Sequence, residues 1–345
     1  MIGIKMGIDF GSANLTVFVE GKGIVFCEPS VMVCDASSGK CLAMGSAAKN
    51  MAGKLPPSMY AISPIREGRI HDFDSARLML SRYIERICGS KLFRPNILMC
   101  VPSTLTEIER QALFDVVMAS GAGSACFVSE ALAAAVGAGI SLTEPKGACI
   151  CDIGGDVTDC AVVTMGNIAV SNTVRTGGAG LTQAIVDHVL RNRNIAIGTD
   201  EAERIKHTAG CAVPRETEVA VSVCGKHCDS GLPVYFEITS DEVYEILKPH
   251  LENILNGIRE IMEETAPELC ADLLDSGIVV TGGTAKMYGV GPMIEAATGI
   301  KAVIADTPEH SAAVGIGKLL KNLNYLERNG YVFETGSGEK EMEER

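Results

Sequence analysis

Short apolar runs alternate along most of the chain with longer stretches that repeat apolar residues every three or four positions. The runs at 96–102 and 277–281 have the length and composition of buried strands. The stretches at 74–88 and 240–263 have the spacing of helices that pack one face against a core. Strands that alternate with helices predict an α/β fold with a mostly parallel sheet.

Two helix starts carry capping signals. Asp72 or Asp74 can cap the first long helix, because a carboxylate there can accept from free backbone N–H groups. Thr106 and Glu109 have the spacing of a capping box, which predicts a helix from this point through Ala119.

Two segments share one plan of apolar strand, Asp, apolar residue, Gly, small turn and second strand. The first contains Asp9 and Gly11, and the second contains Asp152 and Gly154. Glycine lets backbone N–H groups approach a polyanion, and a pair of carboxylates can hold a hydrated divalent cation. Each turn alone also suits an ordinary hairpin, but two copies favour a duplicated fold that binds phosphate.

A third glycine turn follows the strand 278–281. Its residues, Gly282-Gly283-Thr284-Ala285, form the type of strand end that admits the sugar and base of a nucleotide close to the backbone. Together, the three turns describe a nucleotide held in a cleft between two related domains.

Composition narrows the class of protein. The 345 residues suffice for about two domains, and 47% of them are hydrophobic. No uncharged apolar run reaches the roughly 18 to 20 residues that span a bilayer, and the N-terminus lacks signal-peptide features, so we expect a soluble, cytoplasmic protein. A net charge of −13 argues against nucleic acid as a partner.

The thirteen cysteines fit a reducing compartment. Most of them lie in apolar strands, where a thiol behaves as a small hydrophobic group, and we expect them to be reduced. The segment from Cys224 to Cys228 resembles half of a zinc site but has no second ligand pair at the usual spacing, so a hairpin loop is favoured.

The three turns resemble those of the actin-like ATPase superfamily, which includes actin, heat-shock chaperone ATPases and sugar kinases. Within it, the chain is similar to the bacterial actin family, MreB, in order from about Met6 to Leu323. Supporting segments include Pro64 to Ile70, Val101-Pro102-Ser103 and Glu130 to Gly139. The resemblance implies an actin-like ATPase fold with two related, ribonuclease H-like α/β domains, each with a smaller subdomain, and a nucleotide in the cleft between them.

The resemblance also suggests domain bounds. Domain I would cover 1–140, with a small subdomain at about 30–72, and a C-terminal helix at about 311–325 would complete it. Domain II would cover 141–310, with a small subdomain at about 180–238. Residues 326–345 are polar and acidic, which predicts a disordered tail.

The resemblance implies roles for the residues of the turns. Asp9 and Asp152 would hold Mg²⁺ through water molecules, and ATP would be the nucleotide. The residues expected at the phosphates are Gly11, Ser12, Ala13, Asn14, Gly154, Gly155 and Asp156, and those expected around the adenosine are Glu203, Lys206, Gly282, Gly283, Thr284 and Ala285.

Two further residues match catalytic positions of the family. Glu130 would orient the attacking water, and Thr158 would help it. Positioning is most of what phosphoryl transfer requires from a protein. The alternative for Glu130 is an exposed carboxylate that the helix dipole favours at a helix start.

Leu92 and Phe93 occupy the position of the family's membrane-inserting loop. A two-residue apolar wedge binds a membrane weakly alone, but repetition along a filament strengthens the binding. The alternative is that both side chains pack in the core.

The chain departs from the family pattern at several site positions. Asp156 stands where the family usually has Gly, and Ser129 replaces the first residue of a Glu pair. Ala179 and Gly180 replace an Asp-Glu pair. An added carboxylate near the terminal phosphate would weaken ATP binding or require more neutralisation by metal.

The resemblance favours a bacterial actin-like cytoskeletal protein that polymerises into homopolymeric, membrane-associated filaments. It would lie at the inner face of the cell membrane and organise cell-wall synthesis with morphogenesis membrane proteins to maintain rod shape. Its enzymatic activity would be at most a weak ATPase coupled to polymerisation. A divergent, non-hydrolysing paralogue that regulates or caps filaments is one alternative, and a small-molecule kinase on the same fold is another.

Overall fold

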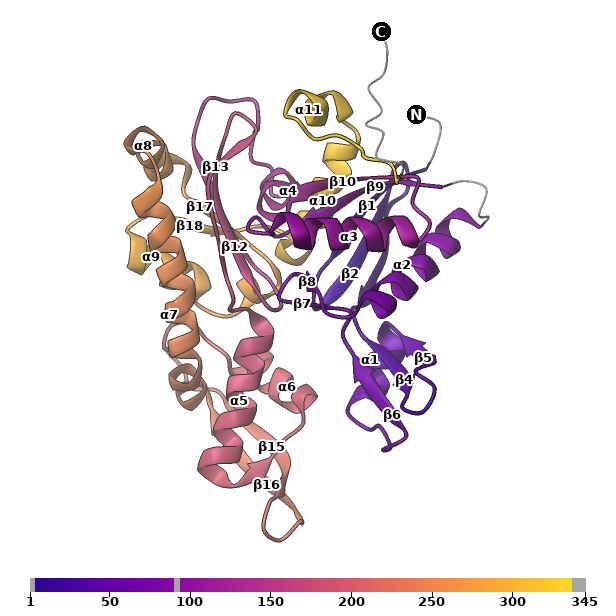
Figure 1. Cartoon of the computed structure of the whole chain (residues 1–345). Coiled ribbons are helices and arrows are strands. Elements are labelled where there is room, and N and C mark those ends of the chain that lie inside the picture. The colour runs from indigo at the N-terminus through magenta and orange to yellow at the C-terminus, as the bar shows by residue number, and fades with distance from the viewer. Residues whose placement is uncertain (1–3, 90–93, 337–345) are drawn as a thin grey trace. The chain divides into compact units, whose positions relative to one another are not determined.

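The computed structural model describes residues 4–89 and 94–336 (Figure 1). The chain divides into two units, each organised around a five-stranded sheet. The first unit comprises Met1–Lys146, Ala161–Ser171 and His310–Arg345, and the second comprises Gly147–Cys160 and Asn172–Glu309. The domain bounds suggested by the sequence stay a prediction.

The sheet of the first unit has the strand order β10-β9-β1-β2-β3. β1 pairs antiparallel with β2 and parallel with β9, and β9 pairs parallel with β10. The sheet is therefore mixed, and the prediction of a mostly parallel sheet is wrong, because short turns join its first three strands. The strands are β1 (Lys5–Phe10), β2 (Asn14–Val19), β3 (Gly23–Pro29), β9 (Asn96–Val101) and β10 (Ser124–Ser129).

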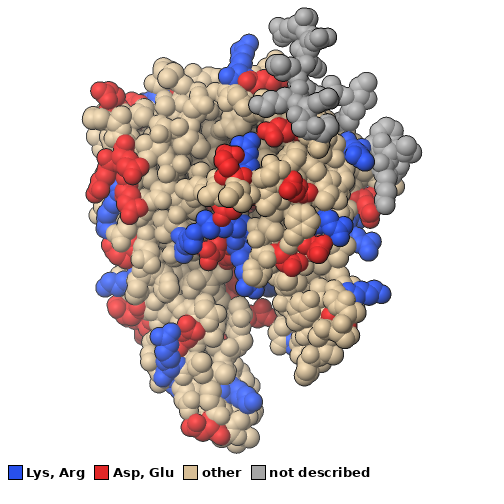
Figure 2. Space-filling view, viewed as in Figure 1, with Lys and Arg blue, Asp and Glu red and all other residues tan. Residues whose placement is uncertain are grey.

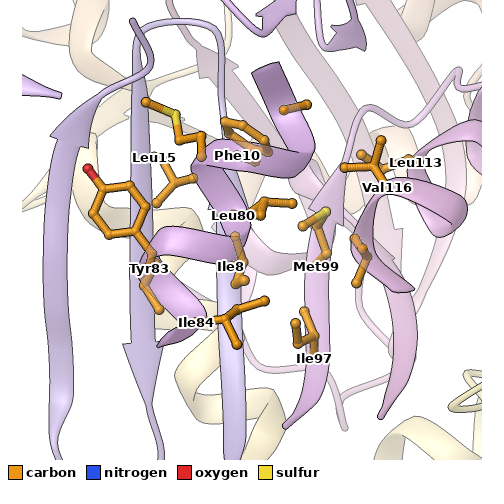
Figure 3. Packing of buried hydrophobic residues seen from close by; sticks show 14 of the residues in the cluster. Ile8, Phe10, Leu15, Leu80, Tyr83, Ile84, Ile97, Met99, Leu113 and Val116 are labelled. Carbon is orange, nitrogen blue, oxygen red and sulfur yellow. The ribbon is translucent and has the colours of Figure 1, made fainter. Parts of the chain in front are cut away.

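Helices cover both faces of this sheet. On one face lie α2 (Phe73–Cys88) and α3 (Glu107–Ala119), and Figure 3 shows Ile8 and Met99 in the core beneath them. Asp72 caps α2 by accepting from Ser75 N at 2.8 Å, and Thr106 and Glu109 form the predicted capping box of α3.

The opposite face packs against α10 (Ser311–Leu320), which contacts β1, β2 and β9. A Cβ on Gly7 would lie 2.1 Å from Ile316 Cγ2, so only glycine lets this helix approach so closely. α4 (Glu130–Gly137) packs on α10 in the same way, since a Cβ on Gly137 would lie 1.8 Å from Ser311 O.

Smaller elements complete the first unit. A three-stranded sheet with the order β5-β4-β6 packs against α1, and β7 and β8 form a two-stranded ribbon. Their bounds are β4 (Met32–Asp35), β5 (Cys41–Met44), α1 (Ser46–Ala52), β6 (Met59–Ile62), β7 (Ile65–Arg66) and β8 (Arg69–Ile70).

The sheet of the second unit has the order β13-β12-β11-β17-β18, which repeats the order of the first. β11 pairs parallel with β17, and β17 with β18, as β1, β9 and β10 do. Residues 161–171, in β12 and β13, belong to the first unit. The strands are β11 (Ala148–Ile153), β12 (Thr158–Thr164), β13 (Asn167–Val174), β17 (Ile278–Thr281) and β18 (Ala302–Ile304).

The remaining elements of the second unit include two helices that the pattern does not predict, α8 (Pro267–Ser276) and α9 (Val290–Thr298). Cys224 lies in β15 and Cys228 follows it, both exposed. The other elements are α5 (Gly178–Arg193), β14 (Ile195–Ala196), α6 (Thr199–Ala209), β15 (Ala220–His227), β16 (Pro233–Thr239), α7 (Ser240–Glu264), η1 (Gly283–Lys286) and η2 (Pro308–His310).

The C-terminal segment differs from the sequence prediction. The helix expected to run to residue 325 ends at Leu320, and α11 (Leu323–Arg328) follows it. Residues 326–336, predicted as part of a disordered tail, are held in place: Leu326 is buried, and Glu334 exchanges two backbone hydrogen bonds with Ala125 at 2.9 and 2.8 Å. This single pair lies at the start of β10, the edge strand of the sheet.

The hydrophobicity of the helices and the distribution of surface charge bear on whether the chain could contact a membrane or a nucleic acid. Among the described residues, no helix combines the length and hydrophobicity needed to cross a membrane. On the face shown in Figure 2, acidic and basic side chains are interspersed, without one broad basic patch.

Candidate functional site

The turn between β1 and β2 is fixed by hydrogen bonds from both of its ends. Gly11 N donates to Asn14 O at 3.0 Å and closes the turn. Ser30 holds it from the end of β3, donating from its N to Ala13 O at 2.9 Å and from its Oγ to Gly11 O at 2.6 Å. Ala13 and Asn14 remain exposed.

The turn between β11 and β12 repeats this geometry. Gly154 N donates to Val157 O at 2.9 Å, at the same place in the hairpin as Gly11 and Asn14. A Cβ on Gly154 would lie 3.0 Å from Val157 O, and a Cβ on Gly11 would lie 3.2 Å from Asn14 O. The two turns therefore share one backbone conformation, in which the glycines leave the backbone open to a ligand.

The second turn is additionally clamped by the start of α5 and by η1. Gly178 N and Thr284 Oγ1 both donate to Gly154 O at 3.0 Å, and Ala179 N donates to Gly155 O at 2.7 Å. These bonds hold residues 154–155 against the N-terminus of a 16-residue helix, whose dipole favours an anion.

Three glycines permit this close approach. A Cβ on Gly177 would lie 2.6 Å from Gly155 O, and one on Gly178 would lie 2.7 Å from Thr284 Oγ1. Gly282 has a φ of 86° and passes so close to β11 that its Cβ would lie 2.2 Å from Ile153 O. Side chains at these positions would separate the turn, the helix and the end of β17.

Each turn follows an aspartate in a different environment. Asp9 is half-buried at the end of β1, no described residue forms an ion pair with it, and burial raises its pKa to about 6. Asp152 is buried at the end of β11 and accepts a hydrogen bond from Thr281 Oγ1 at 2.8 Å.

These carboxylates fit a hydrated cation. A cation beside Asp9 would offset the cost of its buried negative charge. The described residues contain no group of three or more His, Cys, Asp or Glu side chains arranged to hold a metal. A divalent cation bound beside either carboxylate would therefore take most of its ligands from water and from the phosphates of a nucleotide.

Residues of α6 meet the start of α5. Lys206 is buried, and its Nζ donates to Gly178 O and Thr182 Oγ1, both at 2.8 Å. Glu203 Oε1 lies 3.6 Å from Lys206 Nζ and 3.5 Å from His207 Nε2. Within the second unit, the fold thus brings together the predicted residues of the second turn, α6 and η1.

The two predicted catalytic residues have different surroundings. Thr158 is fully buried, and its hydroxyl donates to Thr176 O at 2.7 Å. Glu130 is half-buried in the first turn of α4, after β10. Because β1, β9 and β10 are parallel, Asp9 and Glu130 lie at the same edge of the sheet, where α/β proteins bind ligands. Both catalytic roles stay predictions.

Other predicted site residues differ in how far the structure describes them. Leu92 and Phe93 lie outside the described residues. Asp156 is half-buried in the second turn, and Ser129 Oγ pairs with Ser103 Oγ at 2.7 Å. The first turn of α5 contains no acidic residue.

Sequence reasoning missed the residues that support the turns. Ser30 stabilises the first turn, and Thr281 orients Asp152 in the second unit. The sequence offers one signal for them, a hydroxyl side chain at the end of a strand, but this signal does not show which residue the hydroxyl bonds.

The two sheets have the same strand order, and in each the strand that carries an aspartate, β1 or β11, leads into a glycine turn. This arrangement defines an actin-like protein. The family model described as MreB/Mbl protein matches residues 3–328. The chain belongs to this family.

Individual relatives agree with this assignment. The chain is 35% identical over 327 residues to the cell shape-determining protein Mbl of Bacillus subtilis, covering 94% of this chain and 98% of Mbl. It is 36% identical over 330 residues to the cell shape-determining protein MreB of Escherichia coli K12, covering 94% of this chain and 95% of that protein.

Solved structures show the same fold. The crystal structure of MreB5 of Spiroplasma citri bound to ADP superimposes with a TM-score of 0.90 at 31% identity, covering 95% of this chain and 99% of that one. A MamK double helical filament matches with a TM-score of 0.76 at 18% identity, covering 92% of this chain and 98% of the MamK chain, which is evidence for the fold alone.

Proposed function

We propose that this protein binds ATP and ADP with Mg²⁺ and polymerises in its ATP-bound form. The observation that carries the proposal is the pair of matching glycine turns, each after an aspartate at a strand end. MreB5 of Spiroplasma citri, which shares the fold, was crystallised with ADP and with AMPPNP, and this supports a nucleotide as the ligand.

The proposed roles follow from the chemistry of the side chains. Asp9 and Asp152 bind the waters of Mg²⁺, which neutralises phosphate charge when it is bound. N–H groups of both turns donate to phosphate oxygens, and the dipole of α5 favours the phosphate charge. Glu203 and Lys206, with residues 282–285, line the adenosine side, and Glu130 orients a water for attack on the terminal phosphate.

The proposed cellular role is that of a cytoskeletal protein of rod-shaped bacteria. The related Mbl and MreB proteins are named as cell shape-determining. Filaments of this chain on the inner face of the cell membrane would organise cell-wall synthesis through membrane proteins, with Leu92 and Phe93 as the membrane contact. Repetition along a filament would make such weak contacts effective.

Sedimentation tests the proposal. The protein is spun with ATP, with ADP and without nucleotide, the pellets are viewed by electron microscopy, and released phosphate is measured. We expect pelleted filaments with ATP. A chain that stays monomeric at high concentration with ATP and lipid would contradict it.

Replacing Leu92 and Phe93 by Ser should abolish co-sedimentation with anionic liposomes but leave filaments intact, and unchanged lipid binding would remove these residues from the membrane contact.

A second candidate is a family member that binds nucleotide without hydrolysing it. It is favoured by Asp156 in the second turn and by the absence of an acidic residue from the first turn of α5. Filaments that form with ATP and release no phosphate would support this candidate over the first.

A further inference from the structure

Two thiols face each other inside the hairpin that carries the second turn. Cys151 in β11 and Cys160 in β12 have their Sγ atoms 3.0 Å apart, and the side chains are 0% and 1% exposed. Neither thiol has a role in the proposed nucleotide site, although Cys151 directly precedes Asp152.

The position of these thiols follows from the turn. Gly154 and Val157 close the hairpin, and three residues further along each strand are Cys151 and Cys160, which are therefore directly opposed. Opposed residues of antiparallel strands have Cα atoms about 4.5 to 5.5 Å apart. That spacing lies within the range of about 4.4 to 6.8 Å that a disulfide spans. The bond therefore requires little movement of the strands.

The first unit provides an internal comparison. Counting three residues from Gly11 and from Asn14 gives Ile8 and Val17, which pair directly and are buried. The hairpin thus accepts hydrocarbon side chains at this position, and nothing in its packing requires sulfur there.

We propose that Cys151 and Cys160 form an oxidation site, in which a small peroxide converts the two thiols into a disulfide across the phosphate-binding hairpin. One thiolate attacks hydrogen peroxide, breaking the O–O bond to give a sulfenic acid and hydroxide. The second thiol displaces water from the sulfenic acid and forms the S–S bond. Overall, two thiols and one hydrogen peroxide yield one disulfide and two waters.

Burial controls the rate of this reaction. Contact with Cys151 together with burial raises the pKa of the Cys160 thiol, and the side chains of both thiols are shielded from solvent, so peroxide does not reach them in the closed hairpin. Oxidation therefore proceeds through local opening of the hairpin. A ligand on residues 154–156 stabilises the closed hairpin and slows oxidation, a consequence that rests on the proposed nucleotide binding.

The test exposes the full-length protein to hydrogen peroxide, quenches it and maps disulfides by mass spectrometry without reduction. Cleavage before Asp152 and Asp159 places the two thiols on separate peptides, which only a disulfide joins. Cleavage before aspartates leaves Cys126, Cys149 and Cys151 on one peptide, 115–151, so Cys126→Ala and Cys149→Ala are the matched controls. Cys160→Val, which copies the valine at position 17 of the first hairpin, and Cys151→Ala remove one partner each.

We expect the joined peptides in wild type, Cys126→Ala and Cys149→Ala, and their loss in Cys160→Val and Cys151→Ala. With Mg²⁺ and ADP at ten times its Kd, the joined peptides should form about tenfold more slowly. Oxidation of the exposed Cys27, Cys224 and Cys228 without joined peptides would overturn the oxidation site. Joined peptides whose rate ignores a nucleotide that demonstrably binds would leave the disulfide standing and refute protection by the ligand.

Discussion

Replacement of Asp9 by Asn should stabilise the nucleotide-free protein while impairing its ability to bind Mg²⁺. Burial raises the pKa of Asp9 from 3.8 to about 6. The folded protein therefore holds a proton that the unfolded chain has already released, and stability falls as pH rises from about 4 to about 6. Above that range the ionised carboxylate is a constant cost.

The size of this cost follows from the shift. The difference from 3.8 to about 6 corresponds to about 3 kcal/mol in the free energy of unfolding. Solvent screening at this half-buried side chain makes that value an upper bound. Asparagine has nearly the same shape and no charge, so it avoids the cost.

Urea unfolding between pH 4.5 and 7.5, with EDTA and without nucleotide, measures the effect. We expect Asp9→Asn to be more stable than wild type at pH 7.5, with a difference that shrinks towards pH 4.5. Added Mg²⁺ and ADP should stabilise wild type but not the variant. Asp74→Asn removes an equal charge from a side chain that is 87% exposed and is the control. If Asp9→Asn lowers stability at pH 7.5, or changes it no more than Asp74→Asn does, the reasoning fails.

Three further substitutions test other parts of the site. Thr281→Val leaves the buried Asp152 without its 2.8 Å hydrogen bond, which should lower the free energy of unfolding in urea by about 1 to 3 kcal/mol and weaken Mg-ADP binding severalfold. Thr281→Ser should restore both, and unchanged binding in Thr281→Val would exclude this positioning role. Gly177→Ala places a Cβ 2.6 Å from Gly155 O and should reduce ADP affinity in a titration, whereas Gly180→Ala, with nothing within 4 Å, should not; equal effects would contradict the clamp. Glu130→Ala should abolish phosphate release from ATP while ADP binding persists, and unaltered release would exclude Glu130 from the chemistry.

Local sequence signals determined the elements and the repeated turns. Continuous apolar runs predicted the buried strands at 96–102 and 277–281, and apolar residues repeated every three or four positions predicted the helices at 74–88 and 240–263, because such helices bury one face. Gly11 and Gly154 marked the turns, where a Cβ would lie only 3.2 and 3.0 Å from the carbonyl oxygen that closes each hairpin. The capping box of Thr106 and Glu109 formed as predicted, because both partners lie within one helical turn.

The mixed pairing of the first sheet and the ordered structure of residues 326–336 were not predicted. Short turns make the first three strands antiparallel, and Glu334 pairs with a strand edge that forms only in the folded chain.

The chemistry of the site was decided only by the tertiary structure. Thr281 is 129 residues from Asp152, and no local pattern reveals that its hydroxyl orients that carboxylate. The raised pKa of Asp9 arises from burial by distant segments, which the residue type alone does not show. The sequence by itself determined which residues are available to a phosphate site, and long-range packing decided how each is held and charged.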